Sequence, residues 1–264
     1  MALDSGDTLI SMAIRRTTTL LLLLLAYVAQ NSAAQTAKVR VEIVGIEGDL
    51  RSNALAVASI VNASNSGELP TNQIRRLHTR APEEIELALQ PFGYYRPTIR
   101  SELDTADPTW LARYDIDQGP PILLSSVDVR IRGAGATDSA FMALVADFPL
   151  SVGDTLVHLK YTEGKLALGN FASENGYLDA VFDTNQVRVD LENYTAEVIL
   201  HLDTGPRFFF GPVTLNQDIV DPRLLQGYVT FEPGDTFKLS KLLEMQRGLS
   251  STSFFSQVEI KPQR

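Results

Sequence analysis

An internal repeat with a period of about 80 residues constrains the fold of this chain more than any other feature of its sequence. Gly93-Tyr94 recurs as Gly176-Tyr177, 83 residues further on. Asp117-Gln118-Gly119-Pro120 recurs as Asp203-Thr204-Gly205-Pro206, 86 residues further on. The tripeptide Gly-Asp-Thr occurs at 153–155 and again at 234–236. Short motifs that recur in the same order at one spacing predict a supersecondary unit that is repeated along the chain.

Each repeat begins with a strand pattern and continues with a helix pattern. Apolar, mostly β-branched runs at 39–46, 127–131 and 209–215 predict the first strands. Apolar residues at helical spacing then predict one buried helix face in each repeat: Ile85, Ala88, Leu89 and Phe92; Phe141, Leu144, Val145 and Phe148; and Leu239, Leu242 and Leu243. Thr155 and Thr236 precede the long helices and are candidate N-caps.

A glycine after the helix is expected to end it in the left-handed conformation, and strands follow. They are predicted at 96–103 and 110–116 in the first repeat and at 180–190 and 195–202 in the second. The third repeat offers only 257–261. We therefore predict an α+β fold of tandem β-α-α-β-β units, each a small mixed sheet covered by two helices. The expected boundaries are 38–120, 121–206 and 207–264, with the third unit incomplete.

The N-terminal segment, residues 1–34, has the pattern of a secretory signal peptide. Arg15 and Arg16 precede an apolar run at 20–28, which is followed by small residues up to Ala34. The run is too short to span a bilayer, although an uncleaved anchor is the alternative. The chain has no cysteine, and an exported chain without disulfides fits the bacterial periplasm.

The composition gives no support for nucleic-acid binding or for catalysis. A net charge of −9 is opposite to that of a phosphate-binding surface. His78, His158 and His201 lie far apart in the sequence and have no metal-ligand spacing. The glycine-rich stretch 132–138 lacks the third glycine of a dinucleotide fingerprint, and Asp138 at that place fits a helix N-cap. We expect no enzyme activity, no cofactor and no metal site.

The repeat resembles POTRA domains, the polypeptide-transport-associated units of the TamA and Omp85 families of outer-membrane assembly factors. The resemblance is carried by the β-α-α-β-β order, by Gly-Tyr after the second helix and by Asp-x-Gly-Pro at each joint, and 91–95 looks like the first TamA domain. It implies a periplasmic region that meets a TamB-like inner-membrane partner and handles unfolded outer-membrane clients. These proteins continue into a membrane β-barrel, whereas this sequence ends at Arg264, so we expect the third unit to lack its last strand.

Binding is expected at the edges of the small sheets. An edge strand has unpaired backbone N–H and C=O groups, to which an extended client can add as a further strand. The candidate edge residues are Tyr95, Thr98, Arg100, Val181, Asp183, Val187, Val258 and Ile260. Two other functions stay open: a pore subunit of two-partner secretion with one dedicated substrate, and a free-standing periplasmic scaffold or chaperone.

Overall fold

The computed structural model describes residues 35–261 of the chain, so the predicted signal peptide lies outside the described residues. The described chain divides into two compact units. The first comprises the residues up to 88 together with 98–117, and the second comprises 89–97 together with the residues from 118 onward. None of the helices in the described part is long and apolar enough to cross a membrane.

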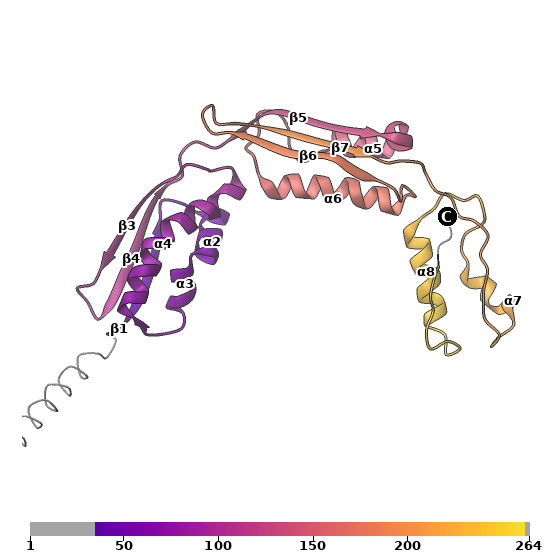
Figure 1. The fold of residues 1–264 in the computed structure, drawn as a ribbon, viewed down its shortest axis with the longest axis horizontal. Helices are drawn as coiled ribbons and strands as arrows, with labels where there is room; N and C mark the ends of the chain where they lie inside the picture. Colours follow the sequence, from indigo (N-terminus) through magenta and orange to yellow (C-terminus); the bar gives the residue numbers. More distant parts are fainter. Residues whose placement is uncertain (1–34, 262–264) are drawn as a thin grey trace, which may run out of the picture. The chain divides into compact units, whose positions relative to one another are not determined.

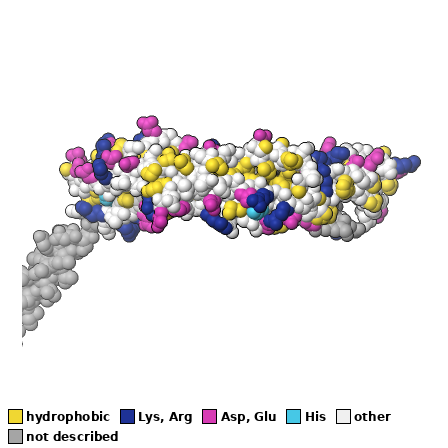
Figure 2. All heavy atoms as spheres, turned by 90° about the horizontal axis from the view of Figure 1, so that it is seen from above, with side chains coloured by type: hydrophobic (Ala, Val, Ile, Leu, Met, Phe, Trp, Pro, Cys, Tyr) yellow, Lys and Arg dark blue, Asp and Glu magenta, His cyan; other side chains and the backbone are white. Residues whose placement is uncertain are grey.

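Charged side chains of both signs are mixed on the surface. On the face shown in Figure 2, Lys and Arg side chains lie among Asp and Glu side chains, and no large area of one sign is seen. Elsewhere in the described chain, charges pair across neighbouring strands, as Arg113 does with Glu42 at 3.7 Å. This face therefore offers no continuous positive stripe that would follow a phosphate backbone.

The first unit is a sheet with helices on one face (Figure 1). Its elements in chain order are β1 (Thr36–Val44), α2 (Gly48–Val57), α3 (Ser59–Ser64), β2 (Leu69–Pro70), α4 (Thr71–Leu89), β3 (Thr98–Asp104) and β4 (Thr109–Asp117). The predicted β-α-α-β-β order is present, with the first helical stretch divided into α2 and α3.

The strand order of this sheet is β2-β1-β4-β3. β1 runs parallel to β4 over the pairs from Lys38–Thr109 to Val44–Asp115, and β3 and β4 form an antiparallel hairpin. The predicted crossover of the first strand and the predicted final hairpin are thus confirmed. The two-residue β2 was not predicted, because two residues carry no periodic signal; it pairs with β1 only at Thr36 and Ala37.

The sequence pattern explains which faces of this unit are buried. In β1, Val39 and Ile43 are buried while Lys38 and Arg40 are exposed, as the two-residue period of a strand requires. In α4, the predicted face is confirmed, since Ile85, Ala88 and Leu89 are all buried. Phe92 of that predicted face lies beyond the helix, in the short turn η1 (Gln90–Phe92), and is half-buried.

The second unit repeats this plan over its first part. The elements are β5 (Leu123–Arg132), η2 (Gly133–Thr137), α5 (Ser139–Ala146), α6 (His158–Glu174), β6 (Val181–Asp190), β7 (Thr195–Asp203), α7 (Pro222–Leu225), η3 (Gln226–Tyr228) and α8 (Leu239–Ser250). The sheet order is β5-β7-β6, with β5 parallel and β6 antiparallel to β7. The predicted two helices cover this sheet, and α6 lies along one of its faces (Figure 1).

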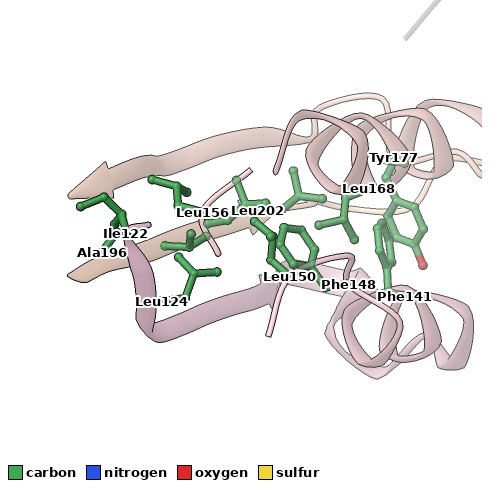
Figure 3. Close-up of a cluster of buried hydrophobic side chains, with 13 residues drawn as sticks. Ile122, Leu124, Phe141, Phe148, Leu150, Leu156, Leu168, Tyr177, Ala196 and Leu202 are labelled. Atoms are coloured by element: carbon green, nitrogen blue, oxygen red, sulfur yellow. The ribbon is translucent and has the colours of Figure 1, made fainter. Parts of the chain in front are cut away.

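One apolar cluster holds the sheet and the two helices of the second repeat together (Figure 3). Phe141 of α5 is fully buried and lies edge-on to Phe171 of α6, with ring centroids 4.6 Å apart. Val198, Leu200 and Leu202 point from β7 into the same cluster. The alternation predicted for this strand is therefore its buried face.

The predicted strands at 209–215 and 257–261 were wrong for the third repeat. Among the described residues after 206, Phe209 makes one isolated bridge to Thr236 and no strand forms. In the two complete repeats the first and penultimate strands each pair with the last strand, and the described residues of the third repeat contain no counterpart of it. Phe210 instead stacks on Phe231, with centroids 3.7 Å apart, in a small separate cluster.

Two smaller predictions were also wrong in this unit. Thr155 and Thr236 do not cap helices, because each makes an isolated backbone bridge to the preceding strand segment, and the N-cap positions fall on Val157 and Lys238. The buried face of α8 is formed by Met245 and Leu249 with Leu242 packed beside them, so the predicted face is wrong at Leu243, which is 43 % exposed. Leu243 is exposed because the helix packs on a small cluster and not on a sheet.

The two glycines of α6 give a matched test of its packing. A Cβ on Gly164 would lie 2.3 Å from the ring of Phe148, whereas a Cβ on Gly169 would meet only the Phe182 ring at 3.7 Å. We expect Gly164→Ala to lower the free energy of unfolding by about 1–3 kcal/mol through overpacking. Gly169→Ala should raise it by up to about 1 kcal/mol through helix propensity. Urea denaturation measures both, and equal effects of the two substitutions would contradict the packing shown here.

Candidate binding edges and repeat joints

The penultimate strand of each complete repeat lies at the edge of its sheet. Within residues 35–261, β3 neighbours β4 alone and β6 neighbours β7 alone. Thr98 and Arg100 lie on β3, and both are exposed. An exposed edge of this kind has backbone groups available to a further strand. The pairing of a client with these residues stays a prediction.

The β6 edge is interrupted near its start. Its register with β7 shifts between Phe182 and Thr184, so Asp183 is an extra, bulged residue. The carboxylate of Asp183 forms an ion pair with Arg132 of β5, the strand at the opposite edge of the sheet. Because a bulge hinders strand addition, Val181 and Asp183 lie at the poorer part of this edge. The regular part begins at Thr184.

The remaining candidate residues are Val187 on β6 and those on β3, which differ in burial and in charge. Val187 is half-buried and packs against the apolar cluster of the second repeat, so its side chain belongs to the core of that repeat. β3 pairs with β4 without a register shift over all seven of its residues. Its side chains include Arg100, Glu102 and Asp104, and charges on an edge strand limit uncontrolled pairing.

Tyr95 does not lie on an edge strand, and its prediction was wrong. β3 begins only at Thr98, because Gly93 has a φ of +90° and Pro97 has no N–H for the ladder. The Tyr95 hydroxyl instead bonds Nε2 of His158 at 2.7 Å. Burial raises the pKa of Tyr95 and lowers the pKa of His158, so both groups are neutral in this contact near pH 7.

Val258 and Ile260 were also predicted on an edge, and this was wrong. Neither residue lies in a strand, and both pack against the small cluster around Phe210 and Phe231. The segment has no neighbouring strand in the described chain, and its position is set by the packing of these two side chains against the cluster.

The repeated glycines mark two joints with the same backbone geometry. The carbonyl of Gly93 accepts the N–H of Ile122 at 2.8 Å, and the carbonyl of Gly176 accepts the N–H of Phe208 at 2.7 Å. Ile122 in turn accepts from Leu156 at 2.9 Å. Both glycines have a positive φ, of +90° and +85°. The sequence predicted left-handed glycines here but not that their carbonyls hold the beginning of the next repeat.

The repeated Gly-Asp-Thr tripeptide makes the other backbone bonds of each joint. At the first joint, the N–H of Leu124 donates to Asp154 and the N–H of Gly153 donates to Leu124, both at 2.8 Å. The same two bonds recur at 2.8 Å at the second joint. There Phe210 takes the place of Leu124, and Asp235 and Gly234 take those of Asp154 and Gly153. The Gly-Asp-Thr motif is therefore a turn that pairs with the first strand segment of its repeat.

In the part of the chain that the structure describes, no three or more His, Cys, Asp or Glu side chains form a group that could hold a metal ion. His78 bonds the Tyr114 hydroxyl at 2.8 Å, and His201 bonds Asp128 at 3.1 Å, in different repeats. The stretch 132–138 is a short 3-10 turn followed by a cap: Oδ1 of Asp138 accepts the N–H of Ala140 at 3.0 Å. The N-cap interpretation of this stretch is thus confirmed.

A shallow groove lies on the first unit. Its volume is about 650 Å³, and it is lined by Trp110 together with mostly polar residues near the start of β1 and β4. Arg75 lies over the Trp110 ring, 5.0 Å from its centroid. No buried polar group converges on this groove, so it lacks the features of an active site.

Each complete repeat is thus a small α+β unit with its last strand in the middle of the sheet and its penultimate strand at the edge. Residues 40–118 match the family model described as POTRA domain TamA domain 1. The first repeat, residues 40–118, is therefore identified as a POTRA domain of the TamA type.

Solved structures of related domains were also found. POTRA domains 3–5 of BamA from Haemophilus influenzae are 17 % identical and match over 86 % of this chain and 90 % of that chain, with a TM-score of 0.43. POTRA domains 1–3 of Omp85 from Anabaena are 13 % identical over 86 % of this chain and 89 % of that one, with a TM-score of 0.31. The N-terminal domain of Omp85 from Thermosynechococcus elongatus is 14 % identical over 86 % and 90 %, with a TM-score of 0.33.

Replacement of the joint glycine tests the geometry of the joint. In Gly176→Ala, the new Cβ would lie 2.7 Å from the carbonyl oxygen of Phe208 at a φ of +85°. We expect a loss of about 1–3 kcal/mol from backbone strain alone, and a further loss from the displaced carbonyl. Hydrogen exchange of the Phe208 amide should become faster.

Gly234→Ala is the matched control, since its φ is +94° but a Cβ there meets nothing within 4 Å. Gly234→Ala should lower the free energy of unfolding by the backbone strain alone. Hydrogen exchange of the Phe208 amide should be less affected than in Gly176→Ala. If both variants accelerate Phe208 equally, the close approach at Gly176 is not what orders the joint.

Proposed function

We propose that this chain is the periplasmic POTRA region of an outer-membrane protein assembly or translocation factor of the TamA type. It docks partner proteins and passes unfolded client proteins toward a membrane β-barrel. It acts by binding and not by catalysis. The match of residues 40–118 to the first TamA POTRA domain and the recurrence of the same fold in the second repeat support this proposal.

The partners follow from the same match. The first repeat is the proposed contact for a TamB-like inner-membrane partner, because it is the part of the chain that matches the first TamA domain. The proposed location is the periplasmic side of the outer membrane. The edge strand β3 is the observation that carries the binding mode, since it is exposed, unbulged and paired on one side only.

Strand addition at an edge suits a protein that receives many clients. Backbone N–H and C=O groups are the same in every client, so the main-chain ladder supplies affinity without demanding one sequence. Each net hydrogen bond is worth about 1 kcal/mol, so several in a row give appreciable binding. Outer-membrane clients consist of segments of about ten residues with alternating apolar side chains, which are suited to such pairing.

Site-specific photo-crosslinking tests the proposed edge. A photoreactive residue replaces Arg100 on β3, and the probe is a synthetic peptide of about ten residues with alternating apolar side chains. We expect a crosslink from Arg100 and none from a matched position at Glu83, which is exposed on α4 of the same unit. Crosslinking of equal strength from Glu83 would contradict edge pairing.

Proline substitution separates backbone pairing from side-chain contact. Arg100→Pro and Ser101→Pro are compared, because neighbouring N–H groups in a strand point to opposite sides and only one of the two serves β4. The variant that keeps its melting temperature has lost the outward N–H. It should bind the peptide about fivefold more weakly, the equivalent of one hydrogen bond. Unchanged binding by that variant would refute strand addition at β3.

A further inference from the structure

A carboxylate at the second joint connects three elements of the second unit. Oδ1 of Asp138 caps α5, as described above, and Oδ2 accepts the hydroxyl of Tyr177 at 2.9 Å. The guanidinium of Arg207 lies 3.5 Å from the same Oδ2. The Asp138 side chain is only 15 % exposed and that of Arg207 is 32 % exposed. Water therefore screens this ion pair less than it would screen one on the surface.

Arg207 makes two further contacts at this place. Its Nε donates to the carbonyl of Asn175 at 3.1 Å, just after the end of α6. Its guanidinium also lies over the ring of Tyr177, 5.1 Å from the centroid. Figure 3 shows that ring beside Phe141, and the two centroids are 5.3 Å apart. One side chain thus contacts the cap of α5, the end of α6 and an aromatic ring of the apolar cluster.

Other contacts join the same two parts of the chain. Glu174, the last residue of α6, accepts the N–H of Ser240 at 3.0 Å and is also bonded by its hydroxyl. Lys238 bonds the side-chain oxygen of Asn175. The end of α6 is therefore tied to the beginning of α8, while Arg207 ties the segment that leads there.

The first joint has no equivalent of this arginine. The motif Gly119-Pro120 is followed by Pro121, whereas Gly205-Pro206 is followed by Arg207. A proline side chain cannot donate a hydrogen bond or carry a charge. The backbone bonds of the glycine are the same at both joints, so the charged contact is an addition at the second one.

We propose that Arg207 is a positioning residue that clamps the segment after Pro206 to the second repeat, so that residues 118–261 move as one body. The ion pair with Asp138 fixes the side chain, and the hydrogen bond to the Asn175 carbonyl and the contact with the Tyr177 ring fix its direction. A planar guanidinium with several donors can make all of these contacts at once, which a lysine cannot. The clamp determines in which direction the chain leaves the second repeat, and it is independent of the proposed function.

Distance measurements between two spin labels test the clamp. The chain has no cysteine, so one can be introduced at Asn170 on α6 and one at Glu244 on α8 without background labelling. Both positions are exposed. Residues 35–264 with these labels should give a narrow distance distribution. Arg207→Gln should broaden it about twofold, as expected when a joint gains freedom.

Three further variants make the result specific. Arg207→Lys should also broaden the distribution, because charge alone does not replace the three contacts. Asp138→Asn keeps an N-cap and an acceptor for Tyr177 but removes the charge opposite Arg207, so it should broaden the distribution less than Arg207→Gln. Arg223→Gln is the control, since among the described residues Arg223 pairs with Asp221 of its own segment and its side chain is 84 % exposed. It should leave the distribution narrow.

Circular dichroism first establishes that each variant is folded. A distribution that stays narrow in folded Arg207→Gln would overturn the clamp, and so would a distribution that is already broad without any substitution. Equal broadening by Arg223→Gln would show that any lost charge loosens the segment, which would also overturn the proposal.

Discussion

The parallel pairing of the first strand with the last strand is the constraint on which each complete repeat depends. β1 pairs with β4 and β5 pairs with β7, in both cases across two helical stretches and a hairpin strand. This contact closes a long loop, so its entropic cost must be repaid by the burial of residues on both strands. Once it has formed, the last strand lies in the middle of the sheet and the helices must cover one face. The penultimate strand is then left at the edge, with a neighbouring strand on one side only in the described sheets.

The third repeat shows what happens where the described chain offers no such last strand. Its first segment makes one bridge, and its apolar residues form a small cluster of their own around Phe210 and Phe231. The segment is nevertheless held at its beginning, because the Gly176 carbonyl and the turn at Asp235 bond its backbone. The joints are thus local structures, which depend on a few backbone groups and a positive φ and not on a complete sheet in the following repeat.

The two joints share their backbone bonds and differ in their side chains. A neutral pair, Tyr95 with His158, accompanies the first, and a charged group centred on Asp138 and Arg207 accompanies the second. This difference changes the side chains beside each joint and keeps its backbone bonds. It also explains why the repeat is visible mainly through its glycines: they meet a requirement of the backbone, which side-chain variation leaves unchanged.

Much of the fold was predictable from particular residues. The alternation of Val198, Leu200 and Leu202, the helix face at Ile85 and Leu89, and the left-handed glycines at 93 and 176 are all present as expected. The candidate edge residues on β3 and β6 lie on edge strands, whereas Tyr95, Val258 and Ile260 do not. The bulge at Asp183 and the contacts of Arg207 left no signal in the sequence, since each depends on a partner distant along the chain.

The sequence by itself determined the repeat, the order of its elements, the positions of its turns and the α+β class, because apolar periodicity and turn residues act over a few neighbours. Only the tertiary structure decided which predicted strands obtain a partner, where the edges are interrupted and what holds one repeat to the next. These features arise from hydrogen bonds and ion pairs between residues far apart in the chain. Their geometry exists only after the sheets have formed.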